Sequence, residues 1–171
     1  MIGESTAEFR RLKRLAESAV DQLTDLEFFR SAQDSDNSIA IIYKHMSGNM
    51  VSRWTDFLSS DGEKASRRRD EEFQILEDDS IQSIKANWEA GWGVMFETLS
   101  SLSESDLGKI VTIRGKPLAV SEAIIRQVGH YSYHIGQIVF IAKTIRGSDW
   151  ISLSIPTGKS AEYNRSLGYE K

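Results

Sequence analysis

The amino-acid sequence predicts an all-α protein, a four-helix bundle with one long crossover connection, as a single domain over residues 1–171. Three observations carry this prediction. Four segments, each of roughly 20 to 27 residues, place apolar side chains at helical spacing. Only two prolines occur in the chain, and proline is the strongest breaker of helices. A long polar stretch between the second and third segments suits the crossover of such a bundle.

Apolar periodicity and capping residues define each expected element. The first helix begins near Ser5, and a cap at Asp36 or Asn37 precedes the second. Ser121 with Glu122 starts the last helix, which stops at Gly147. The four expected helices cover about residues 5–29, 38–60, 80–102 and 121–146.

The segments between and after these helices are expected to be irregular or extended. Residues 61–78 are polar and lack helical periodicity, so they form the crossover. Residues 109–120, KIVTIRGKPLAV, alternate and carry turn residues from Arg114 to Pro117, which predicts a small β-hairpin before the last helix. The tail after Gly147 contains many helix breakers and is expected to pack across the bundle or over one end.

Charge argues against nucleic-acid and membrane partners. The formal net charge is −4, and the one basic cluster, Arg67 to Arg69, is followed at once by Asp70, Glu71 and Glu72. We interpret that cluster as a solvated loop. The N-terminus is charged throughout, and no apolar run approaches the ~20 residues of a membrane span, so we expect a cytoplasmic protein.

Cysteine is absent from the sequence. This excludes disulfides, thiolate metal ligands and a cysteine nucleophile. Any thiol chemistry must therefore use a thiol that comes from outside the chain.

The three histidines are the candidate functional residues. His130 and His134 stand four apart on the last helix, so both rings can point at one common atom. They border the apolar stripe of that helix and can face a pocket. His45 lies on the inward face of the second helix, with Gly48 and Asn49 on the next turn. Three nitrogen ligands would leave a coordination position open, as in catalytic metal sites.

Residue spacing alone leaves this interpretation open. Histidines in helical proteins are often partly buried groups that bond to a backbone carbonyl, and an HxxxH pair is a weak pattern. Imidazole ligands suit zinc, nickel, copper and iron, and the sequence places no carboxylate to complete a two-histidine, one-carboxylate iron site. Of these metals we expect zinc or nickel.

The strings YKHMSGN at residues 43–49, WEAGW at 88–92 and GHYSYHIGQI at 129–138 resemble the DinB/YfiT-like superfamily of metalloenzymes, and within it a family of uncharacterised bacterial proteins. The resemblance covers most of the chain. It implies an up-down-down-up four-helix bundle, often a homodimer, with a divalent metal held by His45, His130 and His134. Gln137 matches the glutamine of the motif and, like Asn49, is expected to orient the site.

Relatives in this superfamily include transferases and isomerases that use a small thiol such as bacillithiol or mycothiol. The resemblance therefore implies a metal-dependent transferase that activates a small thiol for attack on an electrophilic substrate. A metal would lower the pKa of a bound water or thiol. A metal-dependent hydrolase, a non-catalytic metal-stabilised binding module and a bundle without metal remain alternatives. The sequence assigns no catalytic residue beyond the metal ligands.

The aromatic residues of the third helix are expected to serve packing. Trp88, Trp92 and Phe96 recur at helical spacing, which is typical of a core or a dimer interface. Gly91 and Gly93 lie among them, and we expect close approach of a neighbouring helix or access to a pocket there.

Overall fold

A computed structural model describes residues 1–31 and 37–169. The described chain is mostly helical and includes one small antiparallel sheet. The elements in chain order are α1 (Ile2–Val20), α2 (Asp25–Phe29), α3 (Ile39–Trp54), the 3-10 helix η1 (Arg69–Phe73), α4 (Ile81–Ser101), η2 (Glu104–Asp106), β1 (Ile110–Ile113), β2 (Lys116–Ala119), α5 (Val120–Arg146), η3 (Gly147–Asp149) and α6 (Ser160–Ser166).

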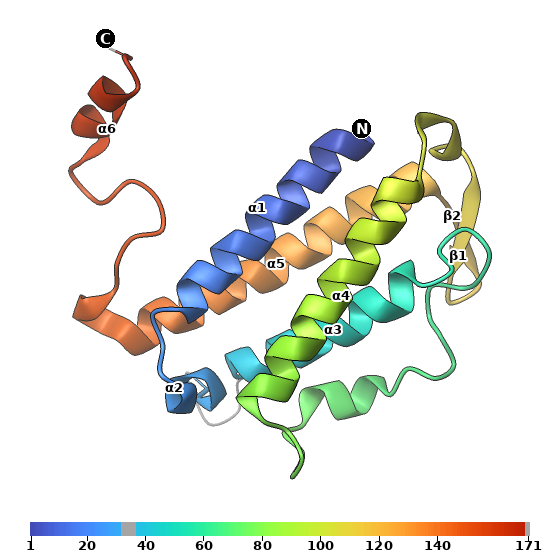
Figure 1. Ribbon diagram of the computed structural model, residues 1–171, viewed down its shortest axis with the longest axis horizontal. Coiled ribbons are helices and arrows are strands. Elements are labelled where there is room, and N and C mark those ends of the chain that lie inside the picture. The colour runs from blue at the N-terminus through green and yellow to red at the C-terminus, as the bar shows by residue number, and fades with distance from the viewer. Residues whose placement is uncertain (32–36, 170–171) are drawn as a thin grey trace.

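The four long helices α1, α3, α4 and α5 lie side by side (Figure 1). The main packing pairs are α3 with α4 and α1 with α5, and α3 also contacts α5. Their apolar faces meet in one core. Its largest fully buried side chains include Phe9, Tyr43, Met46, Met50, Trp54, Trp88, Trp92, Met95 and Tyr131. The contact between α3 and α5 is the one that brings the histidines together.

The first two predicted helices differ from the observed ones at their ends. The helix expected over residues 5–29 is two helices, because Thr24 caps α2: it accepts from the Glu27 N–H at 3.3 Å, and Glu27 accepts the Thr24 N–H at 2.8 Å. The cap of α3 is Ser38 rather than Asn37, and Asp36 lies outside the described residues. The same helix ends at Trp54, short of residue 60, and Asp56 has a positive φ of 49°.

Two glycines of α4 have different surroundings. A Cβ at Gly91 would lie 3.2 Å from the Ser47 Cα and 3.1 Å from the Met50 Cε, so α4 approaches α3 closely there. A Cβ at Gly93 would have no described atom within 4 Å other than its chain neighbours and the backbone of its own helix. The expected close approach is thus confirmed for Gly91 and wrong for Gly93. Trp88 and Trp92 are fully buried, so the aromatic stripe belongs to the core.

The β-hairpin predicted before the last helix is confirmed. β1 and β2 pair antiparallel, with Ile113 opposite Lys116. Arg114 and Gly115 form the turn with φ values of 54° and 71°, as a two-residue hairpin turn requires. The Asp61 carboxylate accepts the backbone N–H groups of both turn residues at 2.8 Å. These two hydrogen bonds fix the hairpin against the crossover segment.

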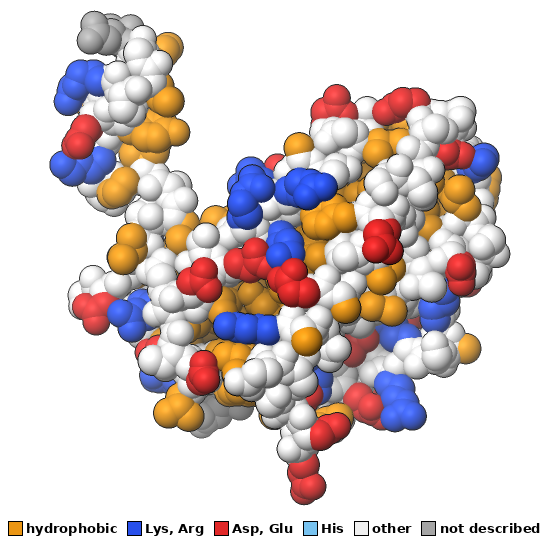
Figure 2. All heavy atoms as spheres, in the orientation of Figure 1, with side chains coloured by type: hydrophobic (Ala, Val, Ile, Leu, Met, Phe, Trp, Pro, Cys, Tyr) orange, Lys and Arg blue, Asp and Glu red, His pale blue; other side chains and the backbone are white. Residues whose placement is uncertain are grey.

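The C-terminal segment packs against the long helices only in its first part. Trp150 and Leu153 contact the core, and the backbone of Ile151 bonds with the Gln22 side chain. Figure 1 shows that the chain then leaves the long helices and ends in α6, away from them. In the space-filling view apolar side chains cover part of α6, while charged side chains of both signs are mixed over α1 and α4 (Figure 2). No described helix is long and apolar enough to cross a membrane.

Candidate functional site

The structure brings the three histidines to one place. His45 comes from α3, and His130 and His134 stand one turn apart on α5. One ring nitrogen from each of the three lies within 4.8 Å of the others, and the two Nε2 atoms of His130 and His134 are 3.1 Å apart. Two nitrogens about 2.1 Å from a tetrahedral ion lie about 3.4 Å apart, so this pair matches a metal half-site.

Two acceptors orient two of the three imidazoles. Nδ1 of His45 lies 3.0 Å from Oε2 of Glu72, and Nδ1 of His134 lies 2.8 Å from Oε1 of Gln137. An acceptor at Nδ1 places the proton there and leaves the lone pair at Nε2. A carboxylate or amide in this position is the usual support of a metal-bound histidine. The contact of Gln137 was expected from the sequence, and that of Glu72 was not.

Glu72 is held in place by an arginine. Nε and Nη2 of Arg67 each donate to the Glu72 carboxylate at 2.7 Å, and the Arg67 side chain is only 4% exposed. The interpretation of residues 67–69 as a solvated loop is therefore wrong for Arg67, although Arg68 and Arg69 reach solvent. The carboxylate rests against Gly48, where a Cβ would lie 2.2 Å from its Oε1.

The charge states of the site follow from burial and neighbours. Burial lowers the pKa of His130 from 6.5 to about 3, and the nearby His134 and His45 add to the effect. Burial also lowers the pKa of His134. For Glu72 burial raises the pKa, but the hydrogen bonds from His45 and Arg67 outweigh it, so the pKa lies below its usual value. His130 is thus neutral at pH 7 and Glu72 is ionised.

The histidines line a cavity of about 310 Å³. Its wall comes from α3, η1, the hairpin turn and α5. Besides the histidines, its lining residues are Asn49, Arg53, Arg67, Arg69, Phe73, Arg114, Arg126 and Gln127. The Phe73 ring lies 4.8 Å from the His45 ring, centre to centre.

Asn49 lines the cavity but contacts another part of the core. Its Oδ1 accepts from the Tyr131 hydroxyl at 3.2 Å, and that hydroxyl accepts from Nε1 of Trp54 at 3.0 Å. All three residues are buried. Asn49 therefore links α3 to α5 beside the histidines and does not hydrogen-bond to an imidazole.

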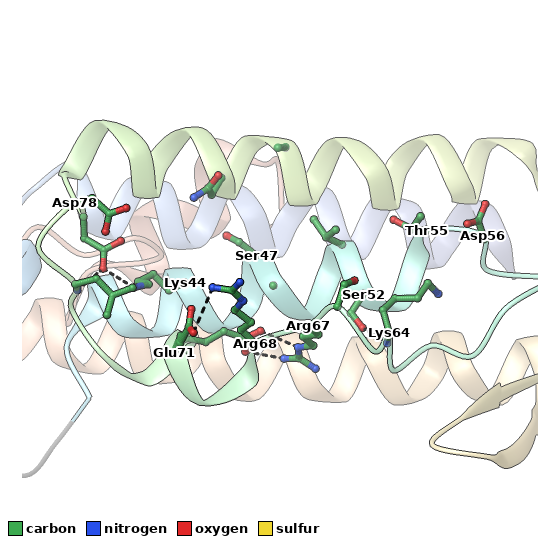
Figure 3. Close-up of a pocket in the computed structure, with 18 residues that line it drawn as sticks. Lys44, Ser47, Ser52, Thr55, Asp56, Lys64, Arg67, Arg68, Glu71 and Asp78 are labelled. Carbon is green, nitrogen blue, oxygen red and sulfur yellow. Dashed lines mark hydrogen bonds and ion pairs between the residues drawn. The ribbon is translucent and has the colours of Figure 1, made fainter.

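A second cavity, of about 720 Å³, lies between α3, α4 and the crossover segment. Figure 3 shows its lining along α3, with Lys44, Ser47 and Ser52 on that helix and Arg67 and Arg68 on the crossover segment. Arg67 lines both cavities. The Arg67 side chain is thus part of the wall between the second cavity and the histidines.

A comparison with protein families shows to which family the chain belongs. The model of the family described as "Protein of unknown function (DUF1572)" matches residues 1–159. The chain belongs to the DUF1572 family. The matched region of this DUF1572 protein contains all three histidines, Glu72 and the hairpin, and it ends before α6. Comparisons with curated proteins and with solved structures find no match.

The donor set of this DUF1572 protein suits a divalent metal ion. Imidazole nitrogens are ligands for zinc, nickel, copper and iron. His45 and His134 each have a partner at Nδ1 that fixes the ring, and burial keeps the His130 ring neutral. The three-histidine group could therefore hold a metal ion.

Proposed function

We propose that the chain is a divalent-metal-dependent transferase with the DinB-like, up-down-down-up four-helix bundle, in which His45, His130 and His134 hold zinc or nickel. Its reaction would join a small bacillithiol-type thiol to an electrophile. The observation that carries the proposal is the convergence of three imidazoles within 4.8 Å, two of them oriented through Nδ1. The choice of a small thiol as substrate rests on the resemblance to the DinB-like superfamily.

The chemistry divides between the ion and the chain. A bound divalent cation would lower the pKa of a thiol beside it, so that the sulfur reacts as a thiolate. The histidines hold the site, and Glu72 keeps Nδ1 of His45 protonated. In the transfer the thiol proton goes to solvent and sulfur forms a bond to carbon. The carbon–chlorine bond of a chlorinated acceptor breaks and chloride leaves, or an epoxide opens and its oxygen takes up a proton.

Elemental analysis of protein purified without chelator tests the premise. The parent chain should carry about one metal ion, since the three histidines are the protein ligands of one site. His130→Ala should lose it, while Lys143→Ala, an exposed change on the same helix, should keep it. A parent chain without metal would contradict the proposal.

A thiol-dependence assay tests the reaction. The metal-loaded protein is supplied with bacillithiol and a chlorinated or epoxide acceptor, and thioether formation is measured. Turnover that needs the thiol, and that His45→Ala abolishes, supports the transferase. Turnover without thiol would favour the metal-dependent hydrolase. Metal binding that raises thermal stability, with no substrate consumed, would favour the non-catalytic module.

The proposal includes a homodimer. Ile125, Tyr133 and Phe140 are exposed on α5 and lie within a quarter-turn of one another around the helix. A second copy of the chain would remove these side chains from water. Sedimentation equilibrium should give a dimer, and Phe140→Ser should shift it toward monomer. A parent chain that sediments as a monomer would contradict this part.

A further inference from the structure

Positive charge surrounds the histidines although the whole chain has a net charge of −4. The cavity is lined by five arginines, and no aspartate or glutamate lines it among the described residues. Three carboxylates outside the lining, Glu63, Asp70 and Glu72, pair with four of these arginines. The cavity therefore has more cationic groups than its own carboxylates neutralise.

Two of the five arginines serve the fold. Arg53 and Arg67 are almost fully buried and are paired with carboxylates. Arg53 donates to Glu63 and to the backbone carbonyl of Gly62, and Arg67 donates to Glu72. Their N–H donors already bond within the chain. These two arginines therefore add positive electrostatic potential to the cavity but offer few free donors to a ligand.

The other three arginines surround the cavity with exposed guanidinium groups. Arg69 on η1 is 48% exposed and lies over the Phe73 ring at 5.0 Å. Arg114 in the hairpin turn is 60% exposed, with its Nε 3.4 Å from Glu63. Arg126 precedes His130 by four residues on α5, and no carboxylate of the described chain lies within ion-pair distance of it. Three separate elements thus direct arginines to one cavity.

A buried amide in the same cavity lacks a partner. Gln127 is 4% exposed, it lines the cavity, and its Oε1 accepts no hydrogen bond from the described residues. A buried polar atom without a hydrogen bond costs about 1–3 kcal/mol, so native structures usually satisfy it with a ligand or water. Gln127 therefore points to a ligand that also offers an N–H or O–H donor.

We infer that the ligand of this cavity carries an oxyanion, a carboxylate or a phosphate, which Arg69, Arg114 and Arg126 bind while the rest of the molecule reaches the histidines. Guanidinium groups bind both oxyanions through paired, charge-assisted hydrogen bonds. The inference rests on the proposed function for the role of the histidines as the reacting end. The arginine subsite itself consists of side chains of this chain and needs no metal.

Isothermal titration of the chelator-treated, full-length protein tests the subsite. Inorganic phosphate and malonate are the anionic probes, and malonamide is the neutral match of malonate. We expect one or both anions to bind and malonamide not to. Arg126→Gln should weaken anion binding by about tenfold or more, because a hydrogen bond to a charged group is lost. Arg165→Gln removes the same charge from α6 and should leave binding unchanged.

The outcomes separate this inference from the proposed function. A preference for phosphate or for malonate supports the inference and identifies the oxyanion. Absence of anion binding, equal binding of malonamide, or equal weakening by Arg126→Gln and Arg165→Gln would overturn it. Metal content is measured on the same preparations before chelation. If the protein binds anions but no metal, this inference stands and the proposed transferase is contradicted. If the protein binds metal but no anions, this inference is overturned and the proposed transferase stands.

Discussion

Oε2 of Glu72 lies 3.0 Å from Nδ1 of His45 and 2.7 Å from Nη2 of Arg67, so one carboxylate oxygen joins the imidazole to the guanidinium. The second oxygen accepts from Nε of Arg67 at 2.7 Å. The bidentate pair fixes the carboxylate, and the carboxylate fixes the histidine ring. The position of one proposed metal ligand thus depends on two residues of the crossover segment.

Glu72→Gln should weaken metal binding without removing a ligand. The amide has no charge to pair with Arg67 and orients His45 less firmly, and loss of such a supporting group costs roughly 10–100-fold in metal affinity. Competition with a chromophoric chelator measures the change. Glu71→Gln, an exposed neighbour, is the control and should bind like the parent. Equal affinities of Glu72→Gln and parent would show that Glu72 has no part in the site.

Gly48→Ala and Gly93→Ala form a matched pair of helix substitutions. The new Cβ at residue 48 would overlap the Glu72 carboxylate, so we expect the free energy of unfolding to fall by about 1–3 kcal/mol. At residue 93 no described atom lies within 4 Å, so the gain in helix propensity should raise stability by up to about 1 kcal/mol. Urea unfolding measures both. Stabilisation by both alanines would contradict the packing of Glu72 against α3.

Tyr131→Phe should destabilise the protein by about 1–3 kcal/mol, because it leaves Nε1 of Trp54 and Oδ1 of Asn49 without a partner in the core. Tyr163→Phe removes the same hydroxyl from an exposed position on α6 and should change stability little. Thermal unfolding of the two variants gives the comparison. Similar losses in both would mean that the buried hydroxyl is not needed.

Asp61→Asn tests the anchor of the hairpin through its pH dependence. Hydrogen bonds from the backbone of Glu63, Gly115 and Arg114 hold the pKa of Asp61 below its usual 3.8. A lowered folded-state pKa means that the carboxylate stabilises the fold above the ordinary pKa and that this contribution is lost as pH falls below it. Urea unfolding should show a larger difference between parent and variant at about pH 6 than at about pH 3. A difference that does not depend on pH would contradict the anchor.

The sequence predicts the helical segments and the hairpin because each has a local cause. Apolar spacing defines α4 and α5, and the turn residues Arg114 and Gly115 define the hairpin. The break between α1 and α2 also has a local signal, since Thr24 and Glu27 stand three apart as in a capping box. Continuous apolar periodicity across this break hides it.

The candidate site is predictable only where its residues lie on helices. The four-residue spacing of His130 and His134 and the inward face of His45 place the three rings toward one pocket, as the structure has them. Glu72 lies in a polar segment without helical periodicity. The run of charged residues there predicts a solvent-exposed loop and gives no sign of a contact with His45. Gly48 is the one hint, because a glycine inside a helix leaves room for a partner that the sequence does not name.

Arg67, Arg69, Glu72 and Phe73 contact the cavity or its histidines, and all four belong to one short stretch of the crossover segment. The long helices hold the imidazoles, while this stretch supplies Arg67, Arg69 and Phe73 of the cavity lining and the carboxylate that orients His45. Substitutions at Arg69 or Phe73 would therefore change the lining of the cavity, whereas Glu63, Arg67 and Glu72 must be kept because they pair with the buried Arg53 and orient His45. For an engineer, Arg69 and Phe73 are the positions of this stretch to vary.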